Sequence, residues 1–289
     1  MPNKLSCRPR TDFQLTWSTS TRGPSFARRA TLALAGLLVW FAPQLHAQSR
    51  DTQAVSLVNS AVAALVQGPL TDATLVATVH STIGSDDETV SGTFETGGPT
   101  TSKTVVSLTT GTITETRNGQ TGFWVGGDGT QHSIPLHNAL NMQAWFFPAF
   151  IAQGLQQNTN YSLAPPTEGT AASTASSTQA LTGYILPPGQ MDSATMNILS
   201  GATAFELDLD PTTLLPVSLQ FIAHPDDDAT RGFPVLILYS NYQLVQGIQV
   251  PFHIQKFLQG TLTQDITVTS CALNQGIPSS VFQVPQIGQ

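Results

Sequence analysis

The chain has 289 residues, of which 40% are hydrophobic and only 10% charged, and its formal net charge at pH 7 is −7. Nucleic-acid binding needs clustered Lys and Arg that neutralise phosphates, whereas only five basic residues are scattered over positions 48–289. The composition therefore excludes a nucleic-acid partner and argues against docking on an anionic membrane surface.

The first 47 residues have the pattern of an export signal. Six of the eleven Lys and Arg lie within the first 29 positions, the apolar run ATLALAGLLVWFA follows at 30–42, and Ala47 supplies a small residue at the expected cut. This order is typical of a cleaved signal peptide, and Arg28-Arg29 leaves a twin-arginine signal as the alternative to an ordinary one. A membrane-spanning helix needs about 20 residues, whereas the apolar run at 30–42 has only 13. We expect cleavage near Ala47, no stable membrane span afterwards, and a periplasmic or secreted protein.

The expected mature part, residues 48–289, carries five basic and seventeen acidic residues and hence a net charge of −12. Its length suffices for a large core, and we expect a single domain. Low-complexity Pro, Ala, Ser and Thr at about 164–180 predict a flexible loop. Cys271 is the only cysteine of this part, so no intrachain disulfide is expected; its strand-like surroundings predict a buried structural thiol.

The first predicted element of the mature part is a helix that Asp51 caps and Gly68-Pro69 ends, with apolar residues at three- and four-residue spacing. From residue 73 the apolar period becomes two, which is typical of strands. Similar runs at 89–95, 103–110, 112–117 and 121–125 are separated by turn residues, of which Asn118-Gly119 is the strongest hairpin signal. This region predicts an antiparallel meander.

The middle segment 136–156 reads LHNALNMQAWFFPAFIAQGLQ and predicts one or two short helices, with Pro148 kinking the segment or starting its second helix. Strands are expected again afterwards, near 180–186, 202–208, 215–223, 233–244, 249–258 and 261–272. Gln246-Gly247 and Gln259-Gly260 predict tight turns between the last three.

A family resemblance lies near the C-terminus, in the segments 210–217 (DPTTLLPV), 239–242 (YSNY) and 245–251 (VQGIQVP) and in Asn274, Phe282 and Pro285. Their order resembles the C-terminal half of the LolA-like lipoprotein carriers and related outer-membrane lipoprotein-sorting proteins. The resemblance implies an α+β, mainly β fold, in which a curved antiparallel sheet forms an incomplete (half) β-barrel with covering helices. It also implies non-catalytic binding of a lipid, an acyl chain or a lipoprotein in the apolar concave side, with no cofactor.

Carriers of this kind hold their closed state with an interior arginine. Arg117 and Arg231 are the candidates in this chain, and neither lies in a motif that aligns with the family's residue. No such role is therefore carried over to either.

An aromatic cluster is the candidate binding site. It comprises one strand residue and four residues of the middle segment: Trp124, Trp145, Phe146, Phe147 and Phe150. These side chains are interpreted as the wall of an acyl-chain pocket, which needs a concave apolar surface. The alternative is that they fill an ordinary core, as most large apolar side chains do.

Metal ligands and catalytic motifs are not recognisable in the sequence. His132 and His137 have Pro135 between them and no third ligand nearby, and the acidic turn at 224–228 lacks the spacing of a calcium loop. There is no Gly-x-Ser-x-Gly, Ser-x-x-Lys or His-Glu-x-x-His motif. We therefore expect no metal and no enzyme activity.

Two other functions stay open at this level. The first is a secreted structural or adhesive β domain, with a solid core and an edge strand that binds a protein. The second is an envelope hydrolase, which requires a His and a carboxylate to meet near a Ser or Thr in a cleft. Nothing in the sequence sets the oligomeric state.

Overall fold

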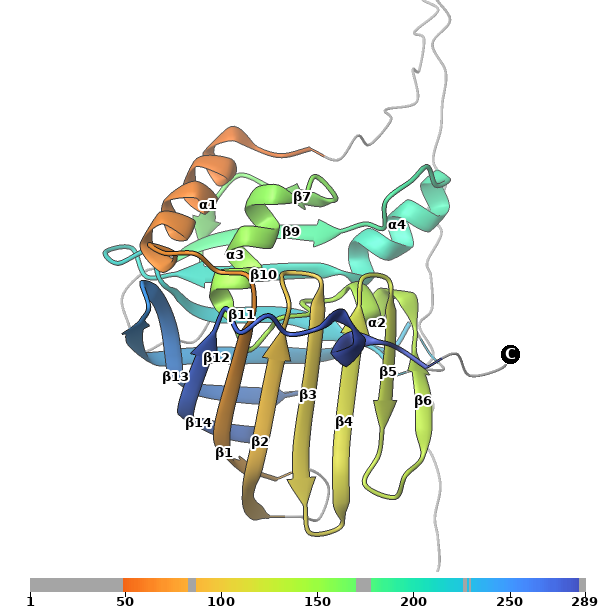
Figure 1. Cartoon of the computed structure of the whole chain (residues 1–289). Helices are drawn as coiled ribbons and strands as arrows, with labels where there is room; N and C mark the ends of the chain where they lie inside the picture. Colours follow the sequence, from red (N-terminus) through yellow and green to blue (C-terminus); the bar gives the residue numbers. More distant parts are fainter. Residues whose placement is uncertain (1–48, 83–86, 170–177, 226–227, 229, 286–289) are drawn as a thin grey trace, which may run out of the picture. The chain divides into compact units, whose positions relative to one another are not determined.

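The structure is a computed structural model that describes residues 49–82, 87–169, 178–225, 228 and 230–285. The expected signal segment 1–47 and the centre of the expected 164–180 loop lie outside the described residues. The described residues form one antiparallel sheet of fourteen strands with four α-helices (Figure 1). Its end strands, β6 and β7, do not pair with each other, so the sheet is curved but not closed. The predicted half-barrel fold is confirmed.

The first half of the sheet is the predicted meander, in which each strand pairs with the next. Its strands are β1 (Ala73–Ser81), β2 (Glu88–Thr96), β3 (Thr101–Leu108), β4 (Gly111–Asn118), β5 (Thr121–Val125) and β6 (Gln131–Ile134). Gly119 turns between β4 and β5 with φ of +61°, which confirms the hairpin predicted from Asn118-Gly119. The sequence did not predict β6.

The second half contains the six strands expected after residue 180, together with the short strands β7 (Tyr161–Leu163) and β8 (Thr167–Glu168). The six are β9 (Gln179–Ile185), β10 (Ala204–Leu209), β11 (Pro216–Ala223), β12 (Phe233–Val245), β13 (Ile248–Leu258) and β14 (Thr261–Leu273). The last strand, β14, pairs with β1, with Ile266 opposite Val79, and so joins the two halves into one sheet. The predicted turns at Gln246-Gly247 and Gln259-Gly260 have positive φ at both residues.

Helices lie against this sheet at positions that the sequence largely predicts. Helix α1 (Thr52–Leu65) begins at Asp51, whose carboxylate accepts hydrogen bonds from the backbone N–H groups of Gln53 and Ala54 at 2.8 and 3.0 Å. In the middle segment, α2 (Leu136–Leu140) packs against β5, while α3 (Pro148–Gln157) packs against α1 and β13. Pro148 is the first residue of α3, where its missing N–H costs nothing.

One helix was missed, and it shortens a predicted strand. Helix α4 (Ser193–Ala202) is capped by Asp192, which accepts from the N–H groups of Ala194 and Thr195. The expected strand at 202–208 therefore begins only at Ala204, because Ala202 still belongs to the helix.

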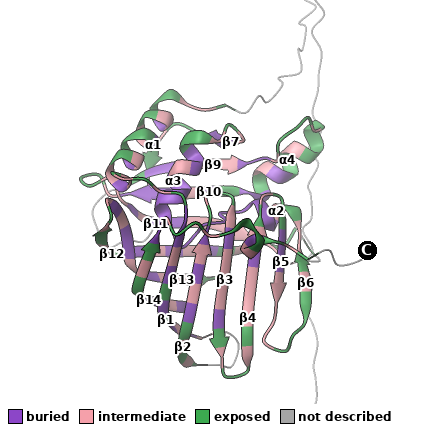
Figure 2. Ribbon diagram, in the orientation of Figure 1, coloured by how far each residue is buried: buried purple, intermediate pink, exposed green. Residues whose placement is uncertain are grey.

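The core lies between the concave face of the sheet and the segment that contains α2 and α3. Alternate residues of β1 point into it, an alternation that Figure 2 shows along the strand, and Leu75 and Val79 are fully buried. Phe94 of β2 contacts the rings of Trp145 and Phe146, with centroid distances of 6.0 and 5.4 Å. Cys271 of β14 is half-buried rather than fully buried, and burial raises the pKa of its thiol to about 11, so it is protonated at neutral pH.

Candidate functional site

A cavity of about 410 Å³ lies on the concave side of the sheet, next to α2. Its apolar wall comes from β5, β6, β11, β12, β13 and the segment after α2, through Trp124, Ile134, Trp145, Phe221, Val235 and Leu258. Its charged lining consists of Glu115 and Arg117 of β4 and Lys256 of β13. Four strands separate β4 from β13 in the sheet, so these side chains meet only because the sheet curves around the cavity.

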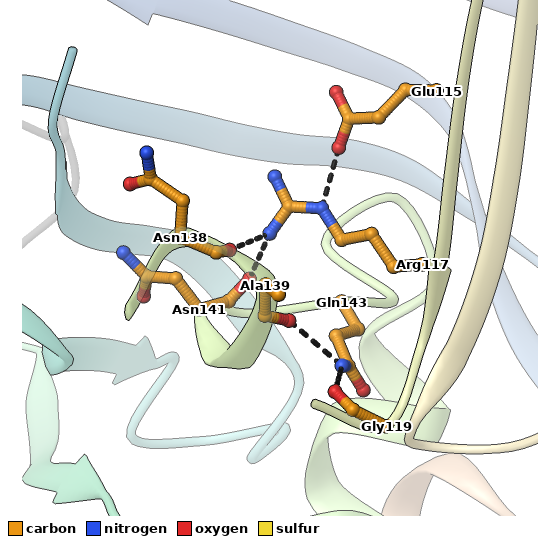
Figure 3. A network of polar contacts seen from close by, with 7 residues as sticks. All are labelled: Glu115, Arg117, Gly119, Asn138, Ala139, Asn141 and Gln143. Atoms are coloured by element: carbon orange, nitrogen blue, oxygen red, sulfur yellow. Dashed lines mark hydrogen bonds and ion pairs between the residues drawn. The ribbon is translucent and has the colours of Figure 1, made fainter. Parts of the chain in front are cut away.

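Arg117 connects the sheet to the segment that begins with α2 (Figure 3). Its Nε donates to Oε1 of Glu115 at 2.5 Å, and its Nη1 donates to the backbone carbonyls of Asn138 and Asn141, the latter at 2.7 Å. The side chains of Glu115 and Arg117 keep 28% and 14% of their exposure, and both line the cavity. Arg117 of the concave face thus holds α2 and the turn after it through two backbone carbonyls.

The other side of this helical turn is tied to the end of β11. The side-chain amide of Asn138 donates to the carbonyl of His224 at 2.7 Å, and its Oδ1 accepts from the N–H of His224 at 3.1 Å. Asn141 donates to the carbonyl of Ile222 at 2.7 Å. The segment is therefore clamped between β4 and β11, across one end of the cavity.

Lys256 lies over the indole ring of Trp145, with its Nζ 4.5 Å from the ring centroid, which is a cation–π contact. Burial disfavours the charged form of Glu115, but Arg117 and Lys256 outweigh it and hold the pKa of Glu115 below its usual value. Burial likewise lowers the pKa of Lys256, and the attraction of Glu115 opposes that shift. The cavity thus combines an apolar wall with three mutually interacting charges.

The aromatic residues singled out in the sequence fall into two groups. Trp124 and Trp145 line the cavity, and Trp124 is stacked on the ring of His132 at a centroid distance of 4.3 Å. The phenylalanines lie in the core around α3, with exposed fractions of 1, 0 and 1% for Phe146, Phe147 and Phe150. Sequence reasoning did not single out Glu115 or Lys256 as part of the site.

A serine, a histidine and an aspartate meet on the outer face of β12, β13 and β14. The Ser240 hydroxyl donates to Nδ1 of His253 at 2.9 Å, and Nε2 of His253 donates to Oδ1 of Asp265 at 2.6 Å. Ser240 is exposed, and its neighbour Tyr239 points to the opposite, buried side. None of the three lines the central cavity.

Within the described ranges, no three His, Cys, Asp or Glu side chains are gathered as ligands for a metal ion. Positions 226 and 227 of the acidic turn lie outside those ranges. No helix in the described part of the chain combines the length and the apolar character needed to cross a bilayer.

A solved structure shares this architecture. A domain described as an outer membrane lipoprotein-sorting protein domain from Vibrio parahaemolyticus matches with a TM-score of 0.50 and 11% identity, over 79% of this chain and 95% of that chain. The chain has the LolA-like fold. Two further structures are similar at lower TM-scores. A LolA superfamily protein from Nitrosomonas europaea has a TM-score of 0.47 and 10% identity, over 81% of this chain and 99% of that chain. LprF from Mycobacterium bovis has a TM-score of 0.27 and 13% identity, over 80% of this chain and 98% of that chain.

The assignment of the LolA-like fold rests on the first of these structures and on the open sheet itself. It confirms the resemblance seen in the C-terminal sequence at the level of the fold. No protein-family model and no curated protein matches the sequence.

Proposed function

We propose that this chain is an exported cell-envelope protein that binds a lipid, an acyl chain or the acyl part of a lipoprotein in the central cavity, without catalysing a reaction. The observation that carries the proposal is the cavity of about 410 Å³ with its mainly apolar wall, a volume within the range of about 300–1,000 Å³ of small-molecule sites. Apolar ligand surface buried there contributes about 25 cal/mol per Å² before ordering costs. The LolA-like fold and the export signal expected at 1–47 support the same function.

The adhesive β domain is less well supported. Such a domain has a solid core and an accessible edge strand, whereas this core contains a cavity. The end strands β6 and β7 have only four and three residues, and short edge strands are a common protection against pairing with another chain.

The hydrolase is the second candidate, because hydrogen bonds connect Ser240, His253 and Asp265 in series, as in a catalytic triad. The two imidazole nitrogens are exchanged relative to that triad, since Ser240 meets Nδ1 and Asp265 meets Nε2. The exposed position of Ser240 argues against a hydrolase. Acyl transfer depends on preorganised donors in a site that excludes water, and Ser240 is exposed on an outer sheet face. A fluorophosphonate probe is therefore expected to leave the protein unlabelled; labelling that disappears in Ser240→Ala would establish the hydrolase instead.

Filling the cavity tests the proposed function. Ala223 lines the cavity at the end of β11, so Ala223→Trp is expected to weaken the binding of a dansylated fatty acid at least about tenfold, which corresponds to a loss of about 1.4 kcal/mol. The measurement is the blue-shifted dansyl emission in a titration with the folded variant. Thr78→Trp, on the exposed outer side of β1, is the matched control and is expected to bind like the parent. Equal binding by parent and Ala223→Trp would show that the probe does not use this cavity.

A further inference from the structure

Two cationic groups in the cavity keep hydrogen-bond donors without a protein partner. Arg117 uses Nε and Nη1 in the contacts that Figure 3 draws. Its Nη2 makes no hydrogen bond to another described residue. The ammonium of Lys256 likewise has no hydrogen bond or ion pair within that part of the chain, and it rests on the Trp145 ring. Partly buried cationic donors gain most from an acceptor that is itself charged.

The charges of the cavity leave one positive charge uncompensated. Glu115, Arg117 and Lys256 are the charged side chains of its lining, and their formal charges sum to +1. The whole chain, in contrast, has a net charge of −7. Because an apolar wall lowers the local dielectric, the attraction for an anion is stronger here than at the surface. The cavity is therefore suited to a ligand with one negative charge.

The rest of the lining defines the remainder of that ligand. Trp124, Phe221 and Leu258 form an apolar wall beside the cationic pair, so an apolar chain can lie along them while the headgroup reaches Arg117 and Lys256. The volume of about 410 Å³ is near the lower end of the range for ligand sites, which favours one acyl chain over several.

Resting on the function proposed above, the geometry points to a narrower ligand class: a single-chain amphiphile with a monoanionic headgroup, of the fatty-acid type. Its carboxylate oxygens accept hydrogen bonds from Nη2 of Arg117 and Nζ of Lys256, and its chain lies along the aromatic wall. Glu115 stays in place as the acceptor of Arg117 Nε and fixes the direction of the guanidinium.

The test compares two competitors with the same chain and different headgroups. Palmitate and hexadecan-1-ol are titrated below their aggregation concentrations against the bound dansylated fatty acid, with the parent protein and two charge variants. Lys256→Met removes the ammonium in the cavity. Lys103→Met makes the same change on the outer face of β3, because Thr104 and Val106, of the opposite parity, face the interior.

Palmitate is expected to compete with the probe for the parent protein with an affinity about tenfold higher than that of hexadecan-1-ol. One or two charge-assisted hydrogen bonds to the carboxylate provide a difference of this size. Lys256→Met should remove most of this preference by weakening palmitate alone, and Lys103→Met should preserve it. Equal displacement by both competitors from the parent would overturn the headgroup assignment while leaving the lipid-binding function intact. Failure of both to displace the probe would contradict the proposed function itself.

Discussion

Replacing Arg117 by methionine is expected to lower the free energy of unfolding by about 3 kcal/mol. The change leaves the partly buried Glu115 carboxylate without its ion-pair partner and the carbonyls of Asn138 and Asn141 without their donor. Breaking a fully buried ion pair from one side costs about 3–5 kcal/mol, and the lower end of that range applies to this partly buried pair. Methionine keeps the apolar stem of the side chain, so the loss reports the guanidinium. Urea unfolding followed by tryptophan fluorescence measures it.

Two further variants isolate this effect. Arg231→Met removes an exposed guanidinium 4.9 Å from the centroid of the Phe233 ring and should cost less than about 1 kcal/mol. The double variant Glu115→Gln/Arg117→Met should recover part of the loss, because the stranded charge is gone. If Arg117→Met is as stable as Arg231→Met, Arg117 does not connect β4 to the segment at 138–141 in the way proposed.

Phe94→Ala is the second large effect, with an expected loss of about 3–5 kcal/mol, the range for deleting a buried phenylalanine ring. Phe94 is 1% exposed and supports Trp145 and Phe146 from the sheet side. The variant should also weaken probe binding, since Trp145 forms part of the cavity wall. Chemical denaturation and the dansyl titration measure the two effects separately.

Phe94→Leu is the matched control, because it keeps an apolar side chain at the centre of the cluster and should cost clearly less than Phe94→Ala. If Phe94→Ala loses under 1 kcal/mol, the packing between β2 and the segment at 145–147 does not stabilise the fold in the way described.

Local signals in the sequence were enough for most of the fold. Period-two apolar runs located β1 to β5 and β9 to β14, and Asp51 and Pro148 marked the starts of two helices. Helix α4 was missed although its cap, Asp192, is present in the sequence. The strands β6, β7 and β8 have two to four residues, too few for a periodic pattern to be read.

The site was only partly predictable, because it depends on residues that meet through curvature. Lys256 shares its parity with Val250, Ile254 and Leu258 on β13, and that alternation could have identified it as a lysine on the inner face. The pattern on β4 is ambiguous, since Glu115 and Arg117 alternate with threonines that fit either face equally well. Whether charges on β4 and β13, which have four strands between them in the sheet, share one cavity follows only from the three-dimensional structure.

Native mass spectrometry with lipid extraction shows directly whether the cavity holds a lipid. The measurement uses residues 48–289 exported to a bacterial periplasm and purified without detergent. We expect a co-purifying species with the mass of a single-chain anionic lipid, present in the parent and Thr78→Trp and lost in Ala223→Trp. A protein that carries no lipid and also fails to bind the dansylated fatty acid would contradict the proposed function.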